Sequence, residues 1–308
     1  MEPSEQTKLY EYNDLFSLLI RLQNDSRLPN KFIISGKKGI GKSTFAYHFI
    51  NYLFSKDEEN KYDLSNFEIN KDNRSYNLVK KKTHPNFFLI DIGENKKIID
   101  ISQIRNMLEF SNKSSFNNKN KIILIDNIEY LNISSANALL KVLEEPNEKL
   151  IFILIHNSAK KILNTIKSRC IVFNKNIKSD DNIKIFEKVS NKSFNHDINK
   201  EFINPYMSVG DLYRITKFSE ENNLNLRDIN PKDFLDFILD VGHKKTVKDL
   251  NLIIRFMQIY FYNTLLKNFS YKLFDQQSYF YQKLNNASKY NLDLDNIFLE
   301  FKNRVLNG

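Results

Sequence analysis

Short, almost uninterrupted apolar runs alternate with longer amphipathic segments over the first 174 residues. Six of these runs predict strands: KFIIS (31–35), NFFLID (86–91), KIID (97–100), KIILIDNI (121–128), KLIFILIH (149–156) and CIVF (170–173). Three segments between them carry apolar residues at helical spacing: DLFSLLIRLQND (14–25), ISQIRNMLEF (101–110) and SSANALLKVLEE (134–145). Continuous apolar strands alternating with helices indicate a parallel sheet that is covered on both faces. We therefore predict an α/β fold for this region.

The pattern changes after about residue 174, where apolar positions recur only at helical spacing. Pro231 opens the helical segment KDFLDFILDVG, and a broad apolar stripe follows from Leu252 to Leu266. No convincing strand appears in this part of the chain. The sequence thus predicts three domains: a sheet domain (1–174), a small helical domain (175–228) and an all-α C-terminal domain (229–308).

The composition adds a positive charge to this picture. The 308 residues carry a formal net charge of +9, and 41% of them are hydrophobic, which is typical of folded domains. An excess of Lys and Arg suits an anionic partner such as nucleic acid. The chain is also rich in Asn, Lys and Ile, so a biased genome explains the charge equally well. The charge alone leaves both interpretations open.

Cysteine content and hydropathy exclude several classes of protein. The single cysteine, Cys170, excludes an internal disulfide and a multi-cysteine zinc site, so we expect no zinc. The longest apolar stretch, Phe256 to Leu266, is too short and too polar to span a bilayer. The charged N-terminal segment predicts no signal peptide. We expect a soluble, cytoplasmic protein without membrane contact.

The segment GKKGIGKS, between a predicted strand and a predicted helix, fits the phosphate-loop pattern G-x-x-x-x-G-K-[ST]. Gly36, Gly39 and Gly41 allow the backbone to curl so that successive N–H groups face a phosphate. They are three of only 7 glycines in the chain. The alternative, a glycine turn beside a surface lysine, explains the strand–loop–helix context less well.

The residues at the start of the following helix supply the chemistry of such a loop. Lys42 is expected to reach the β- and γ-phosphates of ATP, and the hydroxyl of Ser43 to ligate Mg²⁺. The helix N-terminus adds its dipole, and Thr44 completes the predicted ATP-binding segment. The sequence therefore predicts Mg²⁺ and ATP as ligands.

A second part of the nucleotide site lies at the end of the run IILID. Asp126 is in the place of a Walker-B aspartate, which holds Mg²⁺. Nucleotide hydrolases of this kind commonly place a glutamate next, to polarise the attacking water, whereas this chain has Asn127. Glu129 lies two residues further and is expected to face elsewhere. The sequence thus favours ATP binding and leaves hydrolysis doubtful.

Two further segments carry a family resemblance. SSANALLKVLEEP (134–146), followed by TIKSRC (165–170), resembles the clamp-loader branch of the AAA+ ATPases. NDSRLPNKFIISGKKGIGKST (24–44), THPNFFLID (83–91) and ISQIR (101–105) resemble the delta-prime subunits of bacterial DNA polymerase III. The resemblance is dense from about residue 10 to 174 and is weak beyond it.

The resemblance implies a RecA-like AAA+ core with a parallel sheet, a small helical lid and an all-α collar that mediates oligomerisation. Subunits of this family form a five-membered assembly that opens the sliding clamp and closes it around primed DNA. The implied partners are the gamma or tau and delta subunits, the clamp and the DNA. The four-cysteine zinc module of the gamma and tau subunits is absent from this sequence.

In this family the Ser-Arg-Cys motif supplies an arginine finger to the ATP of a neighbouring subunit, which gives Arg169 a catalytic role in trans. Arginine suits that role because its planar, permanently charged fork binds phosphate in two places. The alternative is a salt bridge within this chain. Cys170 is expected to be a packed small hydrophobe.

The resemblance also suggests residues around the nucleotide and the DNA. The sensor-1 position falls near His156 or Asn157, and Asn157 is our candidate for orienting a γ-phosphate. Family helices of the SSANALLKVLEE type begin along DNA phosphates, which makes Arg105, Ser134 and Ser135 candidate DNA contacts. Ser134 and Ser135 equally suit helix capping.

We therefore predict a delta-prime-type clamp-loader subunit whose own ATPase activity is weak or absent. The alternative is a catalytically active AAA+ subunit, either a gamma-like ATPase or a helicase loader. A small-molecule kinase with the same phosphate loop is disfavoured, because such enzymes lack the NALLKVLEEP and Ser-Arg-Cys elements.

Overall fold

The structure is a computed structural model that describes residues 2–93, 96–144, 149–202, 207–242, 250–290 and 292–307. Contacts divide the chain into two compact units, residues 1–181 and 182–308. Each unit contains its own hydrophobic core. No helix in these described ranges is both long and apolar enough to cross a membrane.

The first unit is built on a five-stranded sheet in which every described strand pair is parallel. Its strands are β1 (Lys31–Gly36), β2 (Phe87–Ile90), β3 (Lys121–Ile125), β4 (Leu150–Asn157) and β5 (Ile171–Asn174). They lie in the order β2-β3-β4-β1-β5. The apolar runs predicted to form these five strands are therefore confirmed, as is the α/β class of this region.

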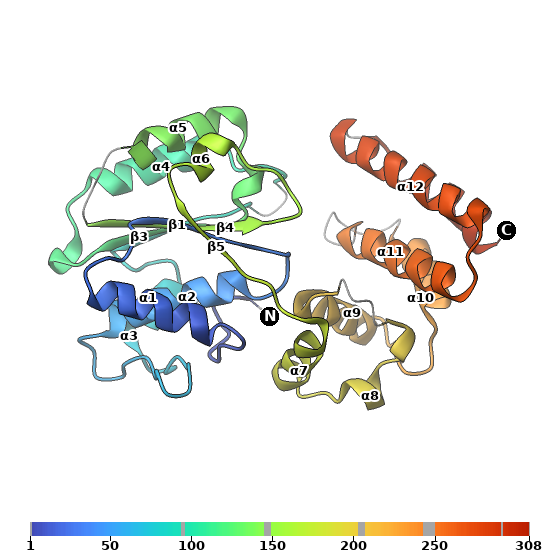
Figure 1. The fold of residues 1–308 in the computed structure, drawn as a ribbon, viewed down its shortest axis with the longest axis horizontal. Coiled ribbons are helices and arrows are strands. Elements are labelled where there is room, and N and C mark those ends of the chain that lie inside the picture. The colour runs from blue at the N-terminus through green and yellow to red at the C-terminus, as the bar shows by residue number, and fades with distance from the viewer. Residues whose placement is uncertain are drawn as a thin grey trace. The chain divides into compact units, whose positions relative to one another are not determined.

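Helices cover both faces of the sheet (Figure 1). On one face lie α1 (Asn13–Asn24), α2 (Lys42–Ser55) and α3 (Arg74–Lys80). On the other lie α4 (Ile101–Asn112), α5 (Ile133–Glu144) and α6 (Asn164–Lys167). Alternate side chains of β1 enter the two cores, since Phe32 and Ile34 pack with one cluster and Ile33 with the other. Because both faces are covered, the strands are apolar throughout.

The run KIID, residues 97–100, does not form a strand, so this prediction was wrong. Ile99 makes only an isolated parallel bridge with Leu131. Asp100 instead caps α4: its carboxylate accepts from the N–H groups of Ser102 and Gln103. The N–H of Asp100 in turn donates to the side-chain oxygen of Gln103. This local capping box ends the extended run before it can join the sheet.

Short helical turns connect these elements in the first unit. A 3₁₀ turn, η1, covers Phe116–Asn118, and a second one, η2, covers Ile128–Tyr130. The second turn packs against β4 and begins two residues after Asp126. The turn therefore lies at the carboxyl end of the sheet, where Asp126 also lies.

The described residues of the second unit form helices and turns only. The helices are α7 (Ser179–Ser190), which begins at the unit boundary, α8 (Phe194–Asp197), α9 (Val209–Glu221), α10 (Pro231–Gly242), α11 (Leu250–Lys267), α12 (Tyr271–Tyr290) and α13 (Asp295–Phe301). A 3₁₀ turn covers Lys200–Phe202 and a π-helical turn covers Lys302–Leu306. The predicted absence of strands after residue 174 holds for these described ranges.

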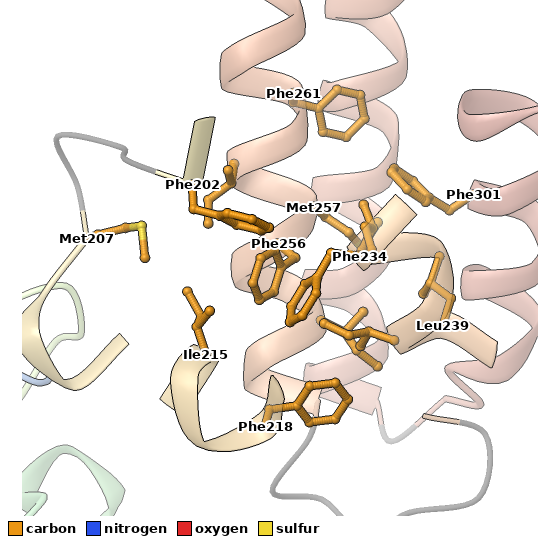
Figure 2. Close-up of a cluster of buried hydrophobic side chains, with 14 of the residues drawn as sticks. Phe202, Met207, Ile215, Phe218, Phe234, Leu239, Phe256, Met257, Phe261 and Phe301 are labelled. Carbon is orange, nitrogen blue, oxygen red and sulfur yellow. The ribbon is translucent and has the colours of Figure 1, made fainter. Parts of the chain in front are cut away.

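Aromatic side chains dominate the core of the second unit (Figure 2). The rings of Phe234 and Phe256 lie 4.6 Å apart between centroids. Phe202 and Phe218, from the predicted lid, both contact Phe234, from the predicted collar. These two predicted domains thus share one hydrophobic cluster, and a boundary between them at residue 228 stays a prediction.

Candidate functional site

The phosphate loop joins β1 to α2 at the carboxyl end of the sheet. Gly39 and Gly41 have φ angles of 83° and 87°, in the left-handed region that favours glycine. Gly36 is required for a different reason: a Cβ atom there would lie 2.4 Å from the carbonyl oxygen of Lys175. The loop therefore needs glycine at positions 39 and 41 for backbone conformation, and at position 36 because a side chain would not fit.

The loop is held in a shape that suits phosphate. The Tyr12 hydroxyl, on a buried side chain, donates to the carbonyl of Ile40 at 3.2 Å. The first N–H groups of α2 have no partner within the helix and point toward its start, where the helix dipole adds positive potential. Thr44 lies in this first turn and is partly buried. Such an arrangement is typical of an anion site.

Lys42 lies inside this loop with its ammonium group turned back onto the backbone. Its Nζ donates to the carbonyls of Gly36, at 2.9 Å, and Lys37, at 2.6 Å. Burial lowers the pKa of Lys42 to about 8, and the nearby carboxylates of Asp126 and Glu129 oppose this shift. An incoming phosphate would offer the ammonium group the full negative charge that these carbonyls lack.

Ser43 and Asp126 come together as the sequence predicts. The Ser43 hydroxyl donates to Oδ2 of Asp126 at 2.6 Å, and the N–H of Asn127 donates to Oδ1 at 2.8 Å. Burial, and to a lesser degree Asp91, raise the pKa of Asp126 to about 6. A hydroxyl beside a carboxylate supplies the hard oxygen ligands that Mg²⁺ prefers. These residues therefore fit a magnesium ion held together with nucleotide phosphates.

Asn127, in the place of the usual glutamate, directs its side chain to the neighbouring strand. Its Nδ2 donates to Oδ1 of Asp91, which directly follows β2, at 2.8 Å. The residue has a φ of 58°, an unusual left-handed conformation that asparagine tolerates. This conformation changes the chain direction and starts η2.

Glu129 does not face away from the site, so this prediction was wrong. Its Oε2 accepts from the backbone N–H of Asn157 at 3.1 Å. Asn157 is the last residue of β4 and pairs in register with Gly36, the first residue of the phosphate loop. Sequence reasoning missed this residue because the turn at Asn127 is not encoded by a glycine.

Asn157 is at the predicted sensor-1 position, beside the loop. Its side-chain oxygen accepts from the N–H of Ala159 at 3.2 Å. His156, the other candidate, is buried and contacts the Ser35 hydroxyl and the Lys160 carbonyl through its two ring nitrogens. Both ring nitrogens of His156 are thus engaged within the fold, and Asn157 remains the candidate for a nucleotide contact.

Arg169 lies at the end of the sheet opposite to the phosphate loop, where the strands begin. It precedes β5 by two residues, and Ile171, the first residue of β5, pairs with Phe32 near the start of β1. From Phe32 to Gly36 the chain advances by about 13 Å at about 3.3 Å per residue. Parallel strands place all their carboxyl ends together, so Arg169 is at the amino-terminal edge and the phosphate loop at the opposite one.

The guanidinium group of Arg169 contacts this chain's own surface. Nη1 donates to the carbonyl of Thr165 at 2.9 Å, and Nη2 forms an ion pair with the carboxylate of Glu144 at the end of α5. The side chains of Arg169 and Glu144 are 33% and 55% exposed. Cys170 packs partly buried against the sheet core, and burial raises the pKa of its thiol to about 11.

The three candidate DNA contacts differ in exposure. Arg105 on α4 and Ser134 on α5 are exposed. Ser135 is fully buried: its hydroxyl donates to the carbonyl of Ile99 at 3.0 Å, and its N–H donates to the Asn132 side chain at 2.8 Å. Ser135 is therefore corrected from a candidate DNA contact to a residue that fixes the start of α5.

Comparison with known proteins identifies the family and several relatives of this chain. The family model described as DNA polymerase III, delta subunit, matches residues 12–179. A DNA polymerase III subunit delta' from Pseudomonas aeruginosa is 30% identical over 155 residues, which cover 50% of this chain and 45% of that protein. The matched region thus spans about half the length of this relative.

Two further similarities extend over more of the chain. A DNA polymerase III subunit gamma from Buchnera aphidicola is 28% identical over 304 residues, covering 87% of this chain and 81% of that protein. A solved structure of a DNA polymerase III gamma subunit-related protein from Thermotoga maritima gives a TM-score of 0.45 at 18% identity, covering 93% of this chain and 99% of that one.

The matched region includes the whole sheet, from the helix before β1 to the end of β5. It therefore contains both the phosphate loop and the Ser-Arg-Cys segment. The parallel five-stranded sheet, with the phosphate loop between β1 and α2, is the RecA-like α/β core that the sequence predicts. This chain belongs to the DNA polymerase III delta subunit family.

Proposed function

We propose that this chain is a delta-prime-type subunit of a bacterial DNA polymerase III clamp loader. The observation that carries the proposal is the placement of Arg169 and the phosphate loop at opposite edges of one sheet. An arginine so placed is far from its own phosphate loop but is available to a neighbouring subunit. A ring or spiral of such subunits would bring each loop against the next arginine.

In this proposal the chain binds Mg·ATP at its own phosphate loop. The loop N–H groups and Lys42 hold the phosphates, and Ser43 and Asp126 are the residues that would hold Mg²⁺. The metal ion would supply positive charge between the phosphate oxygens. The neighbouring Thr44 and Asn157 border the same phosphates. These assignments are supported by two contacts at the carboxyl end of the sheet. Ser43 bonds to Asp126, and Asn157 pairs with Gly36.

Two observations bear on the choice between delta-prime and the alternative, an active gamma-like ATPase or helicase loader. Asn127 cannot accept a proton, and its amide is committed to Asp91, which favours a weakly catalytic delta-prime subunit. The extent of the gamma similarity, 87% of this chain, favours the alternative. We prefer delta-prime because several relatives carry that description.

The proposed partners follow from the same role. They are the gamma or tau and delta subunits, the sliding clamp and primed DNA, all in the bacterial cytoplasm. The net charge of +9, and the exposure of Arg105 and Ser134, suit contact with DNA phosphates. The second unit, with its helical core, is the proposed site of assembly with other subunits.

Reconstitution tests the proposal. The full chain is mixed with the other clamp-loader subunits, and loading of the sliding clamp onto primed DNA is measured with and without it. We expect the chain to co-elute with those subunits and loading to require it. A chain that stays monomeric in the mixture, or loading at an equal rate when it is omitted, would contradict the proposal.

A further inference from the structure

We propose that Glu129 activates the attacking water in this chain's own nucleotide site, the role that Asn127 cannot perform. The inference rests on the proposed function in one respect: it requires that the phosphate loop bind ATP. It goes beyond that function by assigning a catalytic residue, and hence slow ATP hydrolysis, to this polypeptide.

The first support is the position of Glu129 at the phosphate-binding edge. Its carboxylate accepts from the N–H of Asn157, which is directly beside Gly36 in the sheet. Glu129 is therefore placed next to the loop and not behind the sheet.

The second support is the uncommitted oxygen of this carboxylate. Oε1 of Glu129 is buried and has no hydrogen-bond partner among the described residues. Burying such an oxygen without a partner is unfavourable, and more so for a charged group. Such an atom in a native structure calls for an explanation, of which a bound water molecule and a catalytic role are two. An oxygen that waits for a water molecule beside a bound nucleotide provides one.

The third support is that the other two carboxylates of the site accept hydrogen bonds from within the fold. Both oxygens of Asp126 accept hydrogen bonds, from Ser43 and from the N–H of Asn127. Oδ1 of Asp91 accepts from the Asn127 side chain and from the N–H of Ile92. Among the fully buried carboxylate oxygens of the site, Oε1 of Glu129 has no partner in the described part of the chain.

The chemistry is a single displacement. A water molecule hydrogen-bonded to Oε1 attacks the γ-phosphorus, and the bond from that phosphorus to the β–γ bridging oxygen breaks. The electron pair of this bond leaves with ADP. The proton of the water passes to the Glu129 carboxylate and then to solvent, so the products are ADP, phosphate and one proton. A positioned base of this kind contributes about 10²- to 10⁴-fold in rate.

A single-turnover experiment on the full chain tests this role. The protein is held in excess over radiolabelled Mg·ATP, and conversion to ADP is followed for wild type and for Glu129→Gln. Glutamine keeps the volume of the side chain and an oxygen that can accept from Asn157, so the loop should keep its shape. The matched control is Glu109→Gln, which makes the same chemical change on an exposed position of α4.

We expect wild type and Glu109→Gln to convert the ATP, and Glu129→Gln to do so at least 100-fold more slowly. Nucleotide affinity and melting temperature should be equal in all three proteins, which a purely structural role would not give. Equal rates for wild type and Glu129→Gln, or no conversion by wild type that has bound ATP, would overturn the inference and leave the proposed function standing. Failure of wild type to bind Mg·ATP would contradict both.

Discussion

Arg169 donates a hydrogen bond to the carboxylate of Glu144, at the sheet edge opposite to the phosphate loop. This pair joins the Ser-Arg-Cys segment to the end of α5. A partly exposed ion pair of this kind contributes only about 0–1 kcal/mol, so a stronger anionic partner can displace it. The salt bridge within the chain and a role in trans are therefore compatible.

The Glu144→Gln variant separates these two roles of Arg169. Because the pair is weak, the free energy of unfolding should change by no more than about 1 kcal/mol. Removing the competing carboxylate frees the guanidinium group for a phosphate, so ATP hydrolysis by the assembled complex should be retained or faster. Denaturant unfolding and DNA-stimulated ATPase rates measure both effects. A complex inactivated by Glu144→Gln would show that the ion pair itself is needed.

The lowered pKa of Lys42 makes nucleotide binding sensitive to alkaline pH. Lys42 loses its proton near pH 8 in the free protein, whereas bound phosphates favour the charged form. Binding must then take up a proton above pH 8, so affinity for Mg·ATP should fall about fivefold between pH 8 and pH 9. Titration with a fluorescent ATP analogue at several pH values measures it.

The control for this alkaline effect is Lys42→Arg, whose side chain stays charged throughout the range. Any nucleotide binding that remains in this variant should not depend on pH between 7 and 9. Equal affinity of the wild-type chain at both ends of the range would contradict the assignment of Lys42 to the phosphates.

The raised pKa of Asp126 predicts the opposite slope at acid pH. Its carboxyl group takes up a proton near pH 6, and only the carboxylate can ligate Mg²⁺. The affinity of the ATP-bound chain for Mg²⁺ should therefore fall about fivefold from pH 6 to pH 5. The nucleotide also titrates in this range. The same measurement on Asp126→Asn therefore gives the part of the pH dependence that comes from the nucleotide. If both proteins have the same pH profile, Asp126 is not a metal ligand.

Gly36 is expected to tolerate no side chain. A Cβ atom at this position would lie 2.4 Å from the Lys175 carbonyl oxygen and 2.8 Å from the Ile40 side chain. Because the nearer contact is backbone, Gly36→Ala should lower the free energy of unfolding by about 1–3 kcal/mol. The control is Gly93→Ala, where the added atom meets only the flexible Lys96 side chain, at 3.4 Å. Equal stabilities of the two variants in urea would refute this reading of the loop.

Much of the first unit could be predicted from the sequence because its signals are local. The β strands are continuous apolar runs, and the phosphate loop is a contiguous motif between a strand and a helix. The prediction of a strand for KIID was wrong because a second local signal, the Asp100 capping box, outweighs the apolar character of this segment. The burial of Ser135 could have been found, since it lies four and eight residues before the core residues Leu139 and Leu143.

Other features depend on tertiary contacts and could not be read from the chain. The position of Glu129 requires the left-handed turn at Asn127 and the packing of that turn against β4. The separation of Arg169 from the phosphate loop requires the register of β5 against β1. Strand order is set by how helices pack over the whole sheet, and no single segment encodes it.

The most direct test of the account is ATP hydrolysis by the reconstituted clamp loader that carries Arg169→Ala in this chain. The complex must be shown to be fully assembled, and this chain's own affinity for ATP should be unchanged because its loop lies at the other edge of the sheet. Arg169→Lys serves as the second variant, since lysine keeps the charge but lacks the planar fork.

We predict that DNA-stimulated hydrolysis at the neighbouring subunit's site falls about 10³- to 10⁵-fold with alanine and recovers little with lysine. Clamp loading onto primed DNA should fall with it. Wild-type rates of hydrolysis and loading in a fully assembled Arg169→Ala complex would contradict the role in trans and leave Arg169 as the surface partner of Glu144.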